Sequence, residues 1–310
     1  MKDLCGILSI LLLAVQVFGQ TEAALVLSKN KSQEKAAKKE APAQVIPIQV
    51  MGNALLVEAQ IGDQKGFFLL DTGAPGLVVN HSAQEKQVAA NSLSQEFMVA
   101  DTIIRDFRWQ DDQWKNLSAL AIDLSQMKAA RTQPLMGLIG YDILRRYDEI
   151  VIDPVQGTLN LNDAGEKASS ELPLAVVPMK QENHLPVVEA RLNGTVLKLG
   201  IDTGTESNMI DSRKLSAFAP EQYRKLGQDN VRGLDQSVRS QSILQFNTLQ
   251  IGGLLVENAT FTEIDLSHLS PDMAIDGILG SNFLNQFKYA INFRKKIFQL
   301  WALPSDSLPN

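Results

Sequence analysis

The chain has 310 residues, of which 45% are hydrophobic and 21% are charged. This is the balance of a globular protein large enough for two lobes, which excludes a disordered chain. The net charge of -6 and a pI near 5.2 indicate a mildly acidic surface. Such a surface excludes the basic footprint of a nucleic-acid-binding protein, so no nucleic-acid partner is expected.

Residues 1–19 have the pattern of a secretory signal peptide. One early lysine is followed by an apolar run from Leu4 to Phe18 and then by small residues. The run is too short for a spanning helix with a stop-transfer flank. We therefore expect an exported protein, periplasmic or extracellular, that would stay membrane-anchored if the signal were not cleaved. Cleavage removes Cys5, the only cysteine, so the exported chain forms no disulfide.

Residues 20–44 are polar and rich in lysine, which predicts a flexible tail. The alternative is a basic pro-segment that lies over an acidic cleft.

An internal repeat covers most of the remaining chain. The segment "IPIQVMGNALLVEAQIGDQKGFFLLDTG" (46–73) aligns without a gap with "VPMKQENHLPVVEARLNGTVLKLGIDTG" (177–204), which places Asp71 on Asp202. Further on, "MGLIGYDILRRY" (136–147) resembles "DGILGSNFLNQF" (276–287). Because the similar segments follow in the same order, the chain contains two copies of one structural unit.

Each copy is predicted to consist of short strands, one short helix and closing strands. The helices are expected at 141–147 and 281–287, and the closing strands at 149–153, 158–162, 289–293 and 297–301. The predicted divisions are an N-terminal lobe (45–163), a polar linker (164–174), a C-terminal lobe (175–304) and a C-terminal tail (305–310).

The repeated Asp-Thr-Gly is the motif that points to chemistry. A lone Asp-Thr-Gly is usually only a turn. Here it recurs at matching positions after strand-forming residues, and each copy is followed by two apolar residues and a glycine, Gly140 in the first half and Gly280 in the second.

With these motifs the chain, over residues 45–303, resembles the aspartic proteases, and more closely the bacterial retropepsin-like proteins, in which "DTGA" opens the active-site loop. The resemblance implies a mostly β, bilobal acid-protease fold with two β-barrel-like lobes, one short helix in each lobe and an active-site cleft between them. It also implies that the Gly140 and Gly280 segments pass behind the catalytic loops as the psi structure.

Asp71 and Asp202 are the candidate catalytic residues. Two carboxylates held within hydrogen-bonding distance share one proton over a useful pH range. The ionised one can then take a proton from a bound water while the protonated one donates to the scissile carbonyl, with no covalent intermediate, metal or organic cofactor. By resemblance, Thr72 and Thr203 hydrogen-bond across the lobe interface. Gly73 and Gly204 let the backbone approach the carboxylates.

The fourth loop position differs between the halves. Thr205 can donate a hydroxyl hydrogen bond that stabilises ionised Asp202, whereas Ala74 offers Asp71 none. We therefore predict that Asp71 holds the shared proton. The pH optimum should be less acidic than in an enzyme with hydroxyls at both positions.

Other features give weaker expectations. Segments 97–109 and 231–246 are the flap candidates, and Trp109 and Trp114 either line a cleft or pack inside. The histidines, His81, His184 and His268, form no zinc motif and are expected at the surface.

The predicted function is an aspartic endopeptidase that acts as a monomer on extended peptide or unfolded protein, without metal. The alternative is a weak or inactive relative that binds peptides or scaffolds an envelope assembly. A glycosidase pair is disfavoured because nothing in the repeat indicates a sugar cleft. A dimer of half-size units is disfavoured because one chain already supplies both halves of a site.

Overall fold

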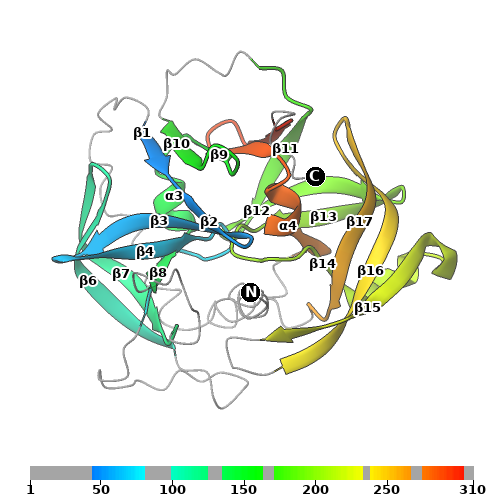
Figure 1. Ribbon diagram of the computed structural model, residues 1–310, viewed down its shortest axis with the longest axis horizontal. Helices are drawn as coiled ribbons and strands as arrows, with labels where there is room; N and C mark the ends of the chain where they lie inside the picture. Colours follow the sequence, from blue (N-terminus) through cyan, green and yellow to red (C-terminus); the bar gives the residue numbers. More distant parts are fainter. Residues whose placement is uncertain are drawn as a thin grey trace.

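The computed structural model describes residues 44–80, 99–124, 135–162, 171–232, 238–266 and 274–303. The predicted signal peptide, the lysine-rich tail up to residue 43 and the C-terminal tail lie outside the described residues, so the divisions drawn there stay predictions. The described part is mostly β, and two barrel-like units lie on either side of a connecting sheet (Figure 1). This confirms the predicted fold class. None of the described helices has the length and apolar character needed to cross a membrane.

The first half contains β1 (Gln44–Pro47), β2 (Gln49–Met51), β3 (Ala54–Ile61), β4 (Gln64–Leu70), β5 (Leu77–Asn80), β6 (Val99–Trp109), β7 (Asp112–Ile122), β8 (Leu135–Ile139), α3 (Tyr141–Leu144), β9 (Glu149–Asp153) and β10 (Thr158–Asn162). The second half contains β11 (Ala175–Glu182), β12 (Leu185–Leu192), β13 (Thr195–Ile201), β14 (Met209–Asp211), the 3-10 helices η4 (Ser212–Ala217) and η5 (Pro220–Gln222), β15 (Tyr223–Arg232), β16 (Val238–Ile251), β17 (Leu254–Ile264), β18 (Gly277–Leu279), α4 (Ser281–Leu284), β19 (Lys288–Asn292) and β20 (Ile297–Trp301).

The two barrels have the same topology. In the first half the strands follow the order β3-β4-β8-β5-β7-β6, and β6 pairs back with β3 to close the ring. In the second half the order is β12-β13-β18-β14-β17-β16, and β16 pairs back with β12. Closure pairs the two outer strands of each ring with each other, and β2 and β15 pair outside the rings with β3 and β16. The repeat in the sequence is therefore a repeat of strand order and pairing.

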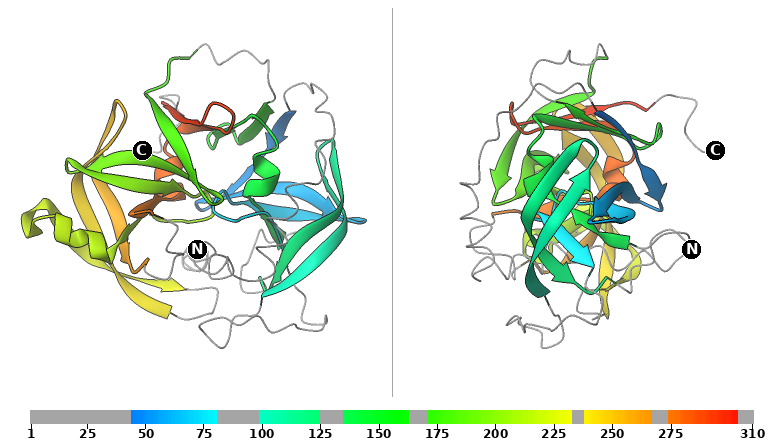
Figure 2. Two further views of the ribbon diagram at one scale, coloured as in Figure 1. Left: turned by 180° about the vertical axis from the view of Figure 1, so that it is seen from behind. Right: turned by 90° about the vertical axis from the view of Figure 1, so that its left-hand side faces the viewer.

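An antiparallel stretch of sheet, continuous with the second barrel, joins the halves. Its order is β1-β10-β9-β19-β20-β11, and the central pair brings β9 of the first half against β19 of the second, with Ile150 opposite Ile291. Seen from behind, this sheet again lies between the two barrels (Figure 2, left). Strand β11 then continues into the second barrel by pairing with β12.

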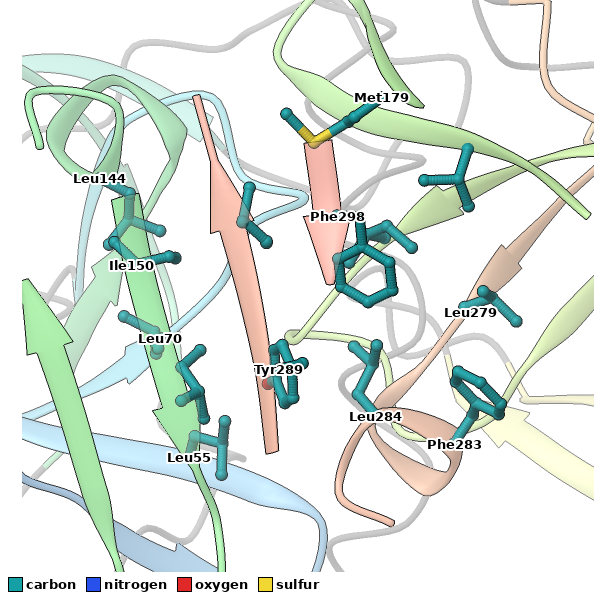
Figure 3. Packing of buried hydrophobic residues seen from close by; sticks show 14 of the residues in the cluster. Leu55, Leu70, Leu144, Ile150, Met179, Leu279, Phe283, Leu284, Tyr289 and Phe298 are labelled. Carbon is teal, nitrogen blue, oxygen red and sulfur yellow. The ribbon is translucent and has the colours of Figure 1, made fainter. Parts of the chain in front are cut away.

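One hydrophobic cluster runs through both halves. Leu70, Leu144 and Ile150 from the first half belong to the same cluster as Tyr289 and Phe298 from the second (Figure 3). Burying one such side chain contributes roughly 2 kcal/mol. Because the cores are continuous, the loops that end β4 and β13 are held in a fixed relation to each other.

Local sequence explains the strands beside the site. Residues Phe68–Leu70 and Leu199–Ile201 are buried throughout, as expected for strand ends covered on both faces. In β11, by contrast, buried and exposed residues alternate from Ala175 onward because only one face meets the core. Between β12 and β13, Asn193 and Gly194 both have positive φ, the backbone of a tight hairpin turn.

The barrel of the first half settles the place of the two tryptophans. Trp109 and Trp114 are buried, and Trp109 packs edge-on against Tyr147, so both are core residues. The described part of the flap candidate 97–109 is β6, which pairs with β7 along its length and with β3 at Phe107 and Arg108. The end of this segment therefore belongs to the barrel wall, and the flap assignment of the rest stays a prediction. The other candidate, 231–246, includes the end of β15 and the start of β16, and residues 233–237 lie outside the described residues.

Candidate active site

Each aspartate of the repeated motif directly follows a buried strand. Asp71 follows β4 and Asp202 follows β13, and each residue is 2% exposed. Their backbone N–H groups donate to matching carbonyls, Ile139 at 3.0 Å and Leu279 at 3.1 Å. Two carboxyl groups from different halves are thus placed in a dry interior, where each pKa is sensitive to its neighbours.

The Gly140 and Gly280 segments lie behind the loops, where the resemblance puts the psi structure. Strand β8 runs parallel to β4 and antiparallel to β5, and β18 has the same relation to β13 and β14. A Cβ on Gly140 would lie 2.6 Å from the Ala74 carbonyl oxygen, and one on Gly280 would lie 2.8 Å from that of Thr205. No side chain fits at either position.

Thr72 and Thr203 connect the two loops by four hydrogen bonds. The Thr72 hydroxyl donates to the Ile201 carbonyl at 2.8 Å and accepts from the Thr203 N–H at 3.1 Å. The Thr203 hydroxyl donates to the Leu70 carbonyl at 2.7 Å and accepts from the Thr72 N–H at 3.1 Å. Both side chains are fully buried. The threonines therefore have the cross-lobe contacts that the resemblance implies.

The motif glycines also face across the interface. A Cβ on Gly73 would lie 2.6 Å from Cγ of Asp202, and a Cβ on Gly204 would lie 2.3 Å from Cγ of Asp71. Real Cβ atoms do not approach other atoms this closely. Each glycine therefore makes room for the carboxyl of the opposite half, a detail that the sequence does not reveal.

The two carboxyls differ in their hydrogen bonds. Oδ1 of Asp71 accepts from the N–H groups of Gly73 and Ala74, both at 2.9 Å. Oδ1 of Asp202 accepts from the Gly204 N–H at 2.8 Å, and its Oδ2 accepts from the Thr205 hydroxyl. Only the second loop thus gives its aspartate a hydroxyl donor in addition to the backbone.

The pKa values of the two carboxyls diverge for this reason. Burial, and then the negative charge of Asp202, raise the pKa of Asp71 well above its usual range. Burial also raises the pKa of Asp202, but the Thr205 hydroxyl, the Gly204 N–H and a hydrogen bond from Asp71 oppose the rise. Both directions agree with the prediction that Asp71 holds the shared proton.

His184 lies in the turn between β11 and β12. The residue is half-buried, and its Nε2 is buried without a hydrogen-bond partner among the described residues, so the expectation of a surface histidine holds only for part of the side chain. The gapless repeat aligns it with Asn53, whose backbone carbonyl accepts a bond from Nδ2 of Asn285 in the other half. His81 and His268 lie outside the described residues.

Metal ligands do not gather in the described part of the chain: no group there of three or more His, Cys, Asp or Glu side chains could hold a metal ion.

Comparison with known proteins agrees with this geometry. Residues 188–283 match a family model described as aspartyl protease. The chain is similar to the crystal structure of an aspartic proteinase from Irpex lacteus, with 13% identity and a TM-score of 0.53 over 86% of this chain and 100% of that one. It also matches Basic 7S globulin from soybean, with 10% identity and a TM-score of 0.48 over 84% of this chain and 94% of that one. No curated protein matches.

The family-model match over residues 188–283 supports the aspartic protease family that the paired motifs predicted. The structural likeness by itself concerns the fold alone, since the identity is low.

Proposed function

We propose that this protein is an aspartic endopeptidase in which Asp71 and Asp202 activate one water molecule to hydrolyse a peptide bond. The observation that carries the proposal is the pair of buried carboxyls, one from each half, on two loops that are hydrogen-bonded to each other. The family and the fold support a protease.

In the proposed reaction, ionised Asp202 takes a proton from the water as its oxygen attacks the scissile carbonyl carbon. Protonated Asp71 donates its proton to the carbonyl oxygen, which gives a neutral tetrahedral diol. Collapse of the diol breaks the C–N bond. The proton now on Asp202 passes to the leaving nitrogen, and a diol hydroxyl returns a proton to Asp71. The pair ends with one proton, as it began.

The substrate class proposed is an extended peptide or unfolded polypeptide, bound by a single chain. An extended strand can pair with cleft and flap edges through main-chain hydrogen bonds, which gives affinity without demanding one side chain. We further propose that the signal peptide is removed and that the enzyme acts outside the cytoplasm. N-terminal sequencing of the secreted protein tests this, and an intact Met1 would contradict it.

Cleavage of a mixed peptide library by the purified protein tests the proposed activity. Asp71→Asn and Asp202→Asn should each lose at least about a thousandfold in kcat/KM, since each removes one of two coupled proton-transfer groups. Asp153→Asn is a matched control, because Asp153 is also buried but only accepts bonds from the Val155 and Gln156 N–H groups of its own turn. Binding of peptides without cleavage at any pH would support the scaffold alternative.

A further inference from the structure

Ser281 makes a side-chain contact with the Asp202 loop that the proposed reaction does not yet use. It is the first residue of α4 and is 2% exposed. Its hydroxyl oxygen lies 2.8 Å from the carbonyl oxygen of Thr203. A carbonyl oxygen can only accept, so the serine hydroxyl is the donor. Because Thr203 is fully buried, water cannot take the place of this donor.

Ser281 also holds the loop through its backbone. Its N–H donates to the Thr205 carbonyl at 2.7 Å. One bond therefore falls on the peptide group that precedes Gly204, and the other falls on the peptide group that follows Thr205. The short segment that carries the motif glycine is held at both ends by one residue.

The carbonyl of Thr203 and the N–H of Gly204 belong to the same peptide group. That N–H donates to Oδ1 of Asp202 at 2.8 Å. A bond to the carbonyl on one side of a peptide group restrains the direction of the N–H on the other side and strengthens its bond by polarisation. Ser281 is thus connected to Asp202 through one peptide group.

The first half has the backbone bond but a different side chain. The aligned segments 136–147 and 276–287 put Tyr141 in the place of Ser281. The Tyr141 N–H donates to the Ala74 carbonyl at 2.8 Å, which matches the backbone bond of the second half. The ring of Tyr141 packs edge-on against Phe293, with ring centroids 5.7 Å apart. The serine contact therefore belongs to the loop whose aspartate is the base in the proposed reaction.

We propose that Ser281 is a positioning residue for Asp202: its hydroxyl holds the peptide group between Thr203 and Gly204 so that the Gly204 N–H points at the carboxyl. The proposal rests on the proposed function, since the rate responds only if Asp202 takes part in the reaction. A stronger bond from Gly204 favours ionised Asp202, the form that takes a proton from the water. In agreement, the Gly204 N–H is one of the groups that lower the pKa of Asp202.

Removal of the hydroxyl tests the proposal. Ser281→Ala introduces no new atom and should lower kcat/KM about fivefold, the effect of losing one buried hydrogen bond. The weaker Gly204 bond should also raise the pKa of Asp202, so the acid limb of the kcat/KM profile should move up by about 0.3 pH unit. Ser281→Cys keeps a weaker donor in similar space and should lie between wild type and Ser281→Ala.

Ser216→Ala is the matched control. The Ser216 hydroxyl also donates to a backbone carbonyl, that of Arg213 at 3.2 Å, but at an exposed position in η4. Its loss is the same chemical change away from the aspartate loops. This variant should have the kcat/KM and the acid limb of wild type.

A second readout does not need activity. In ¹H–¹⁵N NMR spectra, the Gly204 amide proton should move upfield in Ser281→Ala, because a weaker hydrogen bond shields the proton, and should stay in place in Ser216→Ala. An unchanged kcat/KM and acid limb in Ser281→Ala, or an unmoved Gly204 resonance, would overturn the proposal. If wild type cleaves no peptide, the proposed function fails, and the Gly204 resonance still decides whether Ser281 holds this peptide group.

Discussion

The two aspartate loops have the same backbone arrangement and different chemistry. In both, an aspartate follows a buried strand, a threonine hydroxyl crosses to the other half and a glycine meets the opposite carboxyl. They differ at the fourth position, where Ala74 has no hydroxyl and Thr205 donates one to Asp202. The difference teaches that symmetric scaffolding can hold two acids together while a hydroxyl in one loop favours the ionised form of only one of them.

The largest effect is expected where the loops touch. Gly73→Ala and Gly204→Ala would each push a Cβ into the opposite carboxyl, at 2.6 and 2.3 Å from its Cγ. Displacing a reacting group by about 1 Å costs on the order of a hundredfold in rate. Both variants should lose at least that much in kcat/KM. Gly227→Ala, where a Cβ would meet nothing within 4 Å, should keep its activity. Wild-type activity in either loop variant would contradict the claim that each glycine makes room for the carboxyl of the opposite half.

The matching hydrogen bonds of Thr72 and Thr203 should contribute equally to the stability of the protein. Thr72→Val and Thr203→Val each remove a donor and an acceptor and leave a buried N–H of the other loop unpaired. Each should lower the free energy of unfolding by about 2 to 3 kcal/mol, measured from urea denaturation curves. Thr195→Val, in a half-buried part of β13, serves as the control. A large loss in one variant beside none in the other would mean that the two loops are not held alike.

The difference between Ala74 and Thr205 at the fourth loop position should appear in the pH dependence of kcat/KM. Thr205→Ala removes a hydrogen bond that stabilises ionised Asp202, so the pKa of Asp202 should rise and the acid limb of the kcat/KM profile should move up by about one pH unit. Ala74→Ser should give Asp71 a hydroxyl donor, lower its pKa and move the alkaline limb down. An unchanged acid limb in Thr205→Ala would contradict the claim that the Thr205 hydroxyl stabilises ionised Asp202.

Much of the fold could be predicted because the repeat supplies each element twice. The helices after Gly140 and Gly280 and the closing strands β9, β10, β19 and β20 lie where the aligned motifs put them, with the helices shorter than expected. The repeat also paired Asp71 with Asp202, since both end buried strands at matching positions. Two copies of a motif at matching positions of a repeat indicate that the copies act together, which a single turn motif cannot indicate.

Other features depend on contacts that no periodicity reports. His184 is a single residue in a turn, and no pattern in the sequence reports that its Nε2 is buried. Segment 97–109 could be read as a flap because its alternation of apolar residues is that of any strand. Its pairing with β3, which closes the barrel, is a long-range contact. The sequence also does not report that Gly73 and Gly204 each lie against the carboxyl of the opposite half, because these too are long-range contacts.

The central claim is that one proton is shared unequally between Asp71 and Asp202, and a carboxyl titration tests it most directly. The protein, labelled with ¹³C at the aspartate side-chain carbonyls and assigned with the two Asp→Asn variants, would be followed by NMR across acid to neutral pH. Because the pair titrates as a unit, the informative pH range is the one in which the two carboxyls together carry a single negative charge. There the account predicts an Asp71 resonance typical of a protonated acid and an Asp202 resonance typical of a carboxylate. The reverse assignment, or two carboxyls that ionise together at ordinary aspartate pH, would contradict it.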